Sequence, residues 1–229
     1  MKQQMMPQAY KDLWKGRSGE RRSEYQWVWE KLNPPPASVI DVGCVESNFA
    51  IVLSEMGYDV WGIDIRQYGL KHPNFTFMRI DLFNFDSQEK YDYAISISTL
   101  EHLHSNHYGE QQFNFNWLEG LRCLYNLVKP LGNVLATMPY GEQIDGFDWI
   151  QTPTIRELSY VDSIFPIVEF DYYGNVDGEW RKLFEPTARK IKGNKKGFPN
   201  AIVCIKLSKP LYLPDDKIRT LIPESEIRI

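Results

Sequence analysis

The sequence predicts an α/β fold with a doubly wound, mostly parallel sheet that ends in a C-terminal antiparallel strand pair. Between residues 38 and 139, short apolar runs of strand length alternate with segments whose apolar residues recur at helical spacing. Such alternation is typical of sheets in which a helix connects each strand to the next. Later in the chain, two strand-like runs follow one another across a polar stretch, which indicates an antiparallel pair at one sheet edge.

A helix is expected first, over residues 23–32. Its apolar side chains share one face, formed by Tyr25, Val28, Trp29 and Leu32. Ser23 and Gln26 have the spacing of a capping box, and the prolines that follow the helix cannot continue it. Residues 14–22, which precede this helix, are expected to form a loose arm or a lid.

The alternating part of the chain contains five apolar runs that we expect to be strands, at residues 38–42, 59–65, 74–80, 91–98 and 133–139. Two longer segments between these runs carry the apolar stripe of a helix, at residues 48–57 and 117–128. In the tail, we expect a short helix at residues 154–161, followed by strands at residues 165–173 and 200–208.

The composition describes a globular chain of 229 residues with a formal net charge of -4. This charge does not favour non-specific binding to nucleic acid. The three cysteines are far apart and odd in number, so neither a disulfide scaffold nor a zinc site is expected. The N-terminus lacks the apolar core of a signal peptide, and no apolar run is long enough to span a membrane. We therefore expect a cytoplasmic protein, and no pattern favours a particular oligomeric state.

Acidic residues stand where the expected strands end. In open α/β sheets, ligands bind beyond the carboxyl ends of the strands. Asp64 ends the second strand, and a carboxylate there can accept hydrogen bonds from both hydroxyls of a ribose. Asp41 lies at the end of the first strand and Asp81 follows the third, where each could equally well cap a turn. The joint spacing of the three residues favours a binding site.

Residues 38–139 resemble the cofactor half of a class I S-adenosylmethionine-dependent methyltransferase. Five segments carry the resemblance in the family's order: "VIDVGCVES", "YDVWGIDI", "FMRIDLFNF", "YDYAISISTLEHL" and "LYNLVKPLGNVLATMP". The resemblance implies a Rossmann-like, seven-stranded sheet and S-adenosylmethionine as cofactor. It also implies one methyltransferase domain over residues 1–229, with an N-terminal arm and helix (1–37), a cofactor-binding half (38–139), and a substrate side with the C-terminal strands (140–229).

The same resemblance implies the residues that contact the cofactor. Asp64 would bind the ribose, and Asp81 would approach the adenine amino group. The full expected set is Asp41, Gly43, Cys44, Ser47, Asp64, Ile65, Asp81, Leu82 and Ser98.

The first of these segments departs from the family's pattern, because it keeps only one of three expected glycines. Val45 and Ser47 stand at the other two places. A dehydrogenase loop needs its glycines so that the backbone can approach the phosphates of NAD, whereas S-adenosylmethionine has no phosphate. The departure therefore argues against NAD more strongly than against S-adenosylmethionine. Because a positive φ is costly for a β-branched residue, the loop is expected to follow a modified path at Val45.

The segment after the fourth strand is expected to hold the catalytic residues. His102 is the first choice for a general base or for a residue that orients the acceptor, and Glu101 and His107 accompany it. The alternative for His102 is that it caps or packs a helix. Glu101 and His102 also resemble the last two places of a Glu-x-x-Glu-His magnesium motif, but Ser98 replaces the first glutamate, so no metal is expected.

The kind of acceptor is indicated by a motif that the chain lacks. Enzymes that methylate exocyclic or amide nitrogens carry Asn/Asp-Pro-Pro-Tyr after the fourth strand, whereas this chain has "SISTLEH". We therefore expect O-methylation of a small-molecule or glycan acceptor. The chain resembles sugar-modifying methyltransferases, which favours glycan modification. An aromatic acceptor pocket could form from Tyr140, Trp149, Tyr172, Tyr173 and Trp180, although ordinary packing is the commoner use of such residues.

Three alternatives remain open at this point. An RNA methyltransferase could use the basic stretch at residues 181–197, although a solvated loop between the last two strands is the simpler interpretation. A catalytically silent methyltransferase-like subunit would explain the glycine-poor loop. A NAD-linked enzyme is the most distant alternative.

Overall fold

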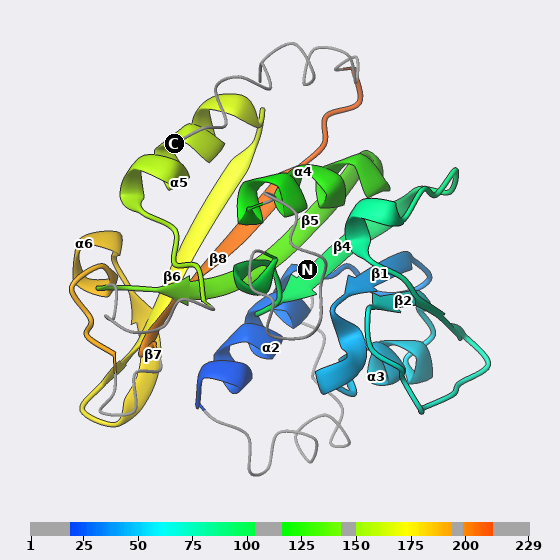
Figure 1. Ribbon diagram of the computed structural model, residues 1–229, viewed down its shortest axis with the longest axis horizontal. Coiled ribbons are helices and arrows are strands. Elements are labelled where there is room, and N and C mark those ends of the chain that lie inside the picture. Colours follow the sequence, from blue (N-terminus) through cyan, green and yellow to red (C-terminus); the bar gives the residue numbers. More distant parts are fainter. Residues whose placement is uncertain (1–18, 104–115, 143–149, 194–198, 213–229) are drawn as a thin grey trace.

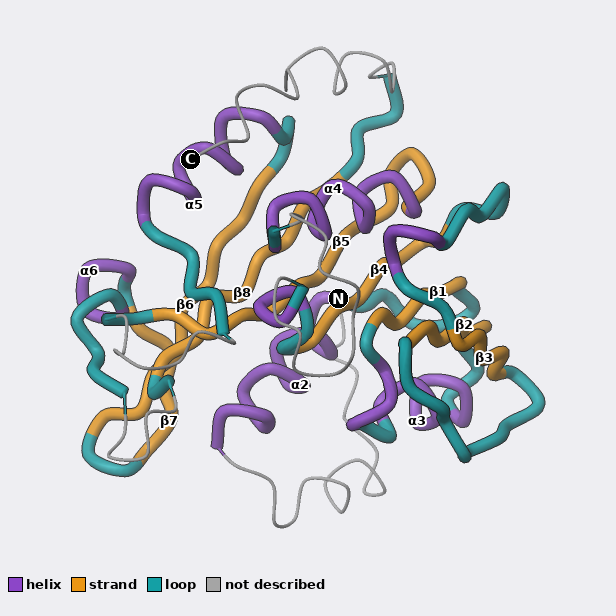
Figure 2. Tube along the Cα trace, viewed as in Figure 1, coloured by secondary structure: helices purple, strands orange, loops and turns teal. Residues whose placement is uncertain are grey.

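The computed structural model describes residues 19–103, 116–142, 150–193 and 199–212, which form one eight-stranded sheet with helices on both faces (Figure 1). The strand order is β3-β2-β1-β4-β5-β8-β6-β7. Figure 2 shows the strands side by side in this order. The strands are β1 (Ser38–Val42), β2 (Asp59–Asp64), β3 (Phe75–Arg79), β4 (Tyr91–Ile97), β5 (Val128–Tyr140), β6 (Val168–Val176), β7 (Glu179–Leu183) and β8 (Ala201–Ser208).

The first five strands form the parallel half of the sheet. β1 lies at its centre and pairs in parallel with β2 on one side and β4 on the other. β3 continues the parallel pairing beyond β2, and β5 continues it beyond β4. This confirms the doubly wound, mostly parallel arrangement, and it brings the ends of β1, β2 and β4 to the same edge of the sheet.

The last three strands form the antiparallel half. β8 lies between β5 and β6 and is antiparallel to both, so the expected C-terminal antiparallel pair is confirmed. The sheet has eight strands rather than seven, because residues 179–183 form β7 against β6 instead of belonging to a polar loop. The turn between them contains Asp177 (φ 56°) and Gly178 (φ 89°), and such Asp-Gly pairs favour tight hairpins. That turn signal was missed in the sequence.

Helices cover the sheet in two layers, each with its own apolar core. On one face lie α2 (Gly19–Lys31) and α3 (Phe49–Glu55), and on the other lie α4 (Trp117–Leu127) and α5 (Ile155–Ile164). A further short helix, α6 (Glu185–Ala188), follows β7. Alternate residues of β1 serve the two cores: Val39 packs on the side of α2 and α3, and Ile40 on the side of α4. The core strands are therefore buried on both faces.

Helix α2 begins four residues before the predicted start. Ser23 lies inside the helix and its Oγ donates to the backbone oxygen of Gly19, so the predicted capping box is wrong. Residues 19–22, which were expected in an arm or lid, form the first turn of α2. The predicted apolar face is buried, and Trp27 is buried as well, with its Nε1 donating to Asp171 at 2.8 Å. Burial on more than one side fixes this helix firmly to the sheet.

Within the described part of the chain, no helix has the length and apolar character needed to cross a membrane. The single domain over residues 1–229 stays a prediction.

Candidate active site

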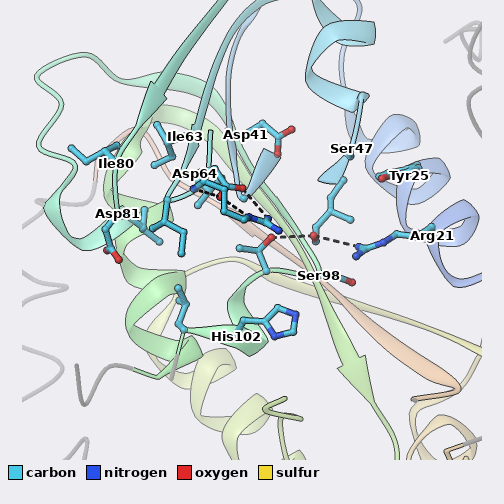
Figure 3. Close-up of a pocket in the computed structure, with 18 residues that line it drawn as sticks. Arg21, Tyr25, Asp41, Ser47, Ile63, Asp64, Ile80, Asp81, Ser98 and His102 are labelled. Carbon is cyan, nitrogen blue, oxygen red and sulfur yellow. Dashed lines mark hydrogen bonds and ion pairs between the residues drawn. The ribbon is translucent and has the colours of Figure 1, made fainter. Parts of the chain in front are cut away.

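A pocket opens at the carboxyl ends of β1, β2 and β4, with α2 closing one side (Figure 3). Its volume is about 840 Å³ when the open solvent at its mouth is included. Five segments of the chain contribute its lining: Arg21, Tyr25, Asp41, Val42, Gly43, Ser47, Ile63, Asp64, Ile65, Arg66, Ile80, Asp81, Leu82, Ile97, Ser98, Thr99, His102 and Leu103.

The turn after β1 needs its single glycine. Gly43 has φ 80° and ψ 36°, and a Cβ at this position would overlap the side chain of Thr99. The chain then forms the 3₁₀-helix η1 (Cys44–Glu46), in which Val45 does not have a positive φ. This is the modified path expected at Val45. The turn therefore fits one glycine without backbone strain at the neighbouring positions.

Asp64 lies at the end of β2 and is surrounded by donors. The backbone N–H groups of Val45 and Arg66 donate to its carboxylate at 3.1 and 2.9 Å. The Arg66 side chain adds Nε at 3.1 Å and Nη2 at 3.1 Å, one to each carboxylate oxygen. The Asp64 side chain is only 3% exposed. The residue expected to bind ribose is therefore held by Arg66 in this structure.

Asp41 ends up buried at the floor of the pocket. It is 3% exposed, and its Oδ2 has no hydrogen-bond partner among the described residues. Burial, and secondarily repulsion from Asp64, raises the pKa of Asp41 to about 7. A buried acceptor without a donor favours a ligand that brings one.

Asp81 caps a turn and also lines the pocket. Its carboxylate accepts from the backbone N–H of Phe83 at 2.8 Å at the start of η2 (Leu82–Asn84). The two interpretations of Asp81 are thus compatible. Leu82 and Ile80 line the same side of the pocket and supply apolar surface suited to a flat aromatic ring.

The end of β4 brings Ser98 and His102 to the pocket. Ser98 has φ 44°, and its backbone N–H donates to both Thr137 oxygens at 3.1 Å. Non-glycine residues in this region of φ often mark functional sites. His102 lies in η3 (Leu100–His102), and its Nε2 is 3.9 Å from Glu101 Oε1.

Glu101 supports this segment from within the core. Its side chain is 2% exposed and does not line the pocket, and its Oε2 has no partner among the described residues. Burial raises the pKa of the Glu101 carboxyl well above its ordinary value. Glu101 therefore lies in the core behind His102.

The other predicted residues are placed as follows. All the expected cofactor residues line the pocket except Cys44, whose side chain is buried in the core beside Gly62. His107 and Trp149 lie outside the described residues. The four remaining aromatic residues do not line this pocket, and they pack in or against the two cores: Tyr140, Tyr172, Tyr173 and Trp180.

Two lining residues that the sequence did not indicate come from α2. Arg21 and Tyr25 lie one helical turn apart and reach the pocket from a segment far from the strand ends. Tyr25 stacks on Phe49 of α3, with ring centroids 5.2 Å apart. No local pattern marks these residues as ligand contacts, since only packing of α2 on the sheet brings them there.

No group of three or more His, Cys, Asp or Glu side chains in the described ranges is arranged to hold a metal ion.

The fold agrees with comparisons to known proteins. A family model described as a methyltransferase domain matches residues 13–188, which is more than half of the chain. The chain belongs to the methyltransferase domain family. The class I methyltransferase resemblance and S-adenosylmethionine as cofactor are thereby confirmed.

Solved structures similar to this methyltransferase share its fold at low identity. TehB from Haemophilus influenzae is 14% identical with a TM-score of 0.52, covering 82% of this chain and 62% of TehB. The N-methyltransferase NodS from Bradyrhizobium japonicum is 11% identical (TM-score 0.56; 85% and 90% covered). Phosphoethanolamine N-methyltransferase 2 from Haemonchus contortus is 14% identical (TM-score 0.56; 82% and 52% covered). None of the curated proteins compared with the methyltransferase matches it.

Proposed function

We propose that this methyltransferase transfers a methyl group to an oxygen of a small-molecule acceptor of the sugar or glycan type, with His102 as general base. The observation that carries the proposal is the position of His102 in the pocket, beyond the end of β4 and beside the buried Glu101. A base at this point can reach an acceptor that lies next to the cofactor.

The residues of the pocket fit S-adenosylmethionine. Asp64 offers a carboxylate for the ribose, and Asp81 with Ile80 and Leu82 forms the side suited to adenine. Asp41 carries a buried oxygen that has no partner among the described residues, which suits the ligand's ammonium group. Gly43 keeps the turn free of a side chain. When bound, the cofactor supplies a methyl group attached to a sulfonium sulfur, and this sulfur becomes the neutral thioether of S-adenosylhomocysteine when the methyl group is transferred.

His102 would accept the hydroxyl proton of the acceptor while that oxygen bonds to the methyl carbon. Such general-base assistance typically contributes about 10²–10⁴-fold in rate. Positioning of the two reactants supplies a further large share of the barrier reduction. Glu101 would support this base from behind, since its Oε1 is 3.9 Å from Nε2.

N-methylation of a small amine is the second candidate. NodS and the Haemonchus enzyme, both similar in fold, are N-methyltransferases. The sequence after β4 favours an oxygen acceptor instead. An RNA acceptor has less support, since three cations of the basic stretch already pair with acids: Lys182 with Asp171 (2.5 Å), Arg189 with Glu185 (3.4 Å) and Lys192 with Glu142 (4.0 Å).

Two measurements test the proposal. Calorimetry should show binding of S-adenosylhomocysteine to the wild type and its loss in Asp64→Ala; unchanged affinity in that variant would remove Asp64 from the ribose site. Methyl-tritiated cofactor is then incubated with small-molecule and oligosaccharide extracts, and labelled products are hydrolysed in acid. O-methylated monosaccharides in the hydrolysate support the proposal, whereas labelled N-methyl amines would establish the second candidate in its place.

A further inference from the structure

One cation reaches the pocket from α2 rather than from a strand end. The side chain of Arg21 is 26% exposed and lines the pocket. Its Nη1 donates to Glu24 Oε2 at 3.2 Å and to the backbone oxygen of Ile97 at 3.4 Å. Figure 3 shows Arg21 and Asp81 on opposite sides of the pocket.

The partner that holds Arg21 is completely buried. Glu24 is 0% exposed, and its Oε1 accepts from Ser98 Oγ at 2.5 Å and from Thr137 Oγ1 at 2.7 Å. A buried carboxylate is tolerated only when donors and a cation compensate for lost hydration. Because Ser98 follows β4 and Thr137 belongs to β5, Glu24 ties α2 to the sheet. The guanidinium of Arg21 is fixed by the same contacts.

The charges around Arg21 keep it cationic. Burial lowers the pKa of its guanidinium, but Glu24, Tyr25, Glu101 and Glu20 outweigh that effect, so the pKa is raised above its ordinary value. The guanidinium is therefore a permanent positive charge at the wall of the pocket.

We propose that Arg21 is a carboxylate-recognition residue of this pocket and that Glu24 positions it. The inference rests on the proposed function, since it requires a cofactor whose adenosine lies against Asp64 and Asp81. In that orientation the amino-acid tail would extend away from Asp81, toward the side where Arg21 lies (Figure 3). A guanidinium binds a carboxylate through two parallel N–H groups. The carboxylate belongs either to this tail or to the acceptor, and the experiment below has one arm for each source.

The first arm measures binding of two ligands by calorimetry: S-adenosylhomocysteine, and 5′-methylthioadenosine, which lacks the amino-acid tail. If the tail is the source, Arg21→Ala should weaken S-adenosylhomocysteine by about 10- to 100-fold and 5′-methylthioadenosine by less than about twofold. Arg21→Lys keeps the charge without the paired donors, so it should lose part of the affinity. The matched control is Arg22→Ala, whose exposed side chain does not line this pocket and which should change neither ligand.

The second arm measures methyl transfer at saturating S-adenosylmethionine to a small-molecule extract separated on an anion-exchange column. If the acceptor is the source, Arg21→Ala should lower transfer to the retained, anionic fraction by at least about tenfold, with S-adenosylhomocysteine affinity unchanged. Transfer to the unretained fraction should persist.

The role of Glu24 is tested with the same two arms. Glu24→Gln removes the charge that holds Arg21 and should reproduce the selective loss seen in Arg21→Ala, to a smaller degree. Thr137→Val removes one donor to Glu24 and an acceptor of the Ser98 N–H but keeps the Glu24 charge beside Arg21, so it should cost less ligand selectivity than Glu24→Gln. The inference would be overturned if Arg21→Ala lost affinity equally for both ligands, or if it lost neither affinity nor methyl transfer. Binding of S-adenosylhomocysteine by the wild type would in that case still support the proposed function. A wild type that binds neither ligand contradicts both.

Discussion

The guanidinium of Arg66 occupies both carboxylate oxygens of Asp64. Nε lies 3.1 Å from Oδ1 and Nη2 lies 3.1 Å from Oδ2, and each oxygen also accepts a backbone N–H. A carboxylate has about four acceptor sites, and these contacts fill them. A ribose whose hydroxyls bind Asp64 must therefore displace the Arg66 side chain.

Replacing Arg66 should consequently affect the free and the ligand-bound protein in opposite ways. We expect Arg66→Ala to bind S-adenosylhomocysteine about five- to tenfold more tightly, because the ribose no longer competes with an ion pair. The free protein should melt about 2–4 °C lower, since a partly buried ion pair is lost. Calorimetry and thermal denaturation measure the two effects. Arg156→Ala, at an exposed position on α5, is the control, and weaker binding by Arg66→Ala would show that Arg66 assists the cofactor instead of competing with it.

Gly43→Ala should destabilise the protein by about 2–4 kcal/mol, because it combines a positive φ with an overlap against Thr99. Gly57→Ala is the matched control: its φ is 97°, but its nearest neighbour, Pro35, is 3.8 Å from the added Cβ. Denaturant unfolding should thus give a clearly larger loss at Gly43. The loss at Gly43 should shrink in a Thr99→Ala background. If Gly43→Ala lost the same free energy of unfolding with and without Thr99→Ala, the overlap with Thr99 would not contribute to the loss.

The raised pKa of Asp41 predicts a particular dependence of stability on pH. The folded pKa of about 7 lies above the ordinary value of 3.8, so between these values the folded state holds a proton that the unfolded state has released. Stability therefore falls as pH rises through this window, by up to about 1.4 kcal/mol per pH unit, and levels off above pH 7. Asp41→Asn lacks this contribution.

The measurement is the difference in unfolding free energy between wild type and Asp41→Asn at pH 5 and at pH 8. The variant should gain relative to the wild type on going to pH 8. Any constant cost of the amide cancels in this comparison, so a difference that stays the same at both pH values would contradict the raised pKa.

His102→Ala should lower turnover by about 10²–10⁴-fold while the affinity for S-adenosylhomocysteine changes by less than about threefold. The separation is expected because His102 lies on the proposed acceptor side, away from Asp64 and Asp81. Single-turnover methyl transfer and calorimetry provide the two values. His72→Ala, on the loop before β3, serves as the control, and full turnover in His102→Ala would leave His102 with a packing role only.

Much of the candidate site follows from local sequence. Asp41, Asp64 and Asp81 each lie at or just beyond the carboxyl end of a strand. Parallel strands bring these ends to one edge of the sheet, so the three residues line the same pocket. Their assignment as cofactor contacts stays a prediction, as does the catalytic role of His102. Cys44 shows where local order fails, because the 3₁₀ turn after Gly43 sends its side chain to the core.

Other features could not be predicted from local order. Arg21 and Ile97 are 76 positions apart, and Glu24 and Thr137 are 113 positions apart, so no periodicity links them. The early start of α2 depends on the same contacts, since burial of Glu24 and Trp27 against the sheet favours helix where the sequence pattern predicted an arm.

The sequence by itself thus determined the alternation of strands and helices, the parallel sheet and the acidic strand ends, because each depends on spacing within one short segment. Only the tertiary structure decided which side chains complete the pocket: α2 had to pack across β4 and β5 before Arg21 could face Asp81, and Arg66 had to fold back before Asp64 was occupied. The physical reason is that hydrophobic burial depends on the spacing of apolar residues within one segment. The partners of buried charges, by contrast, come from distant segments that meet only when the chain is packed.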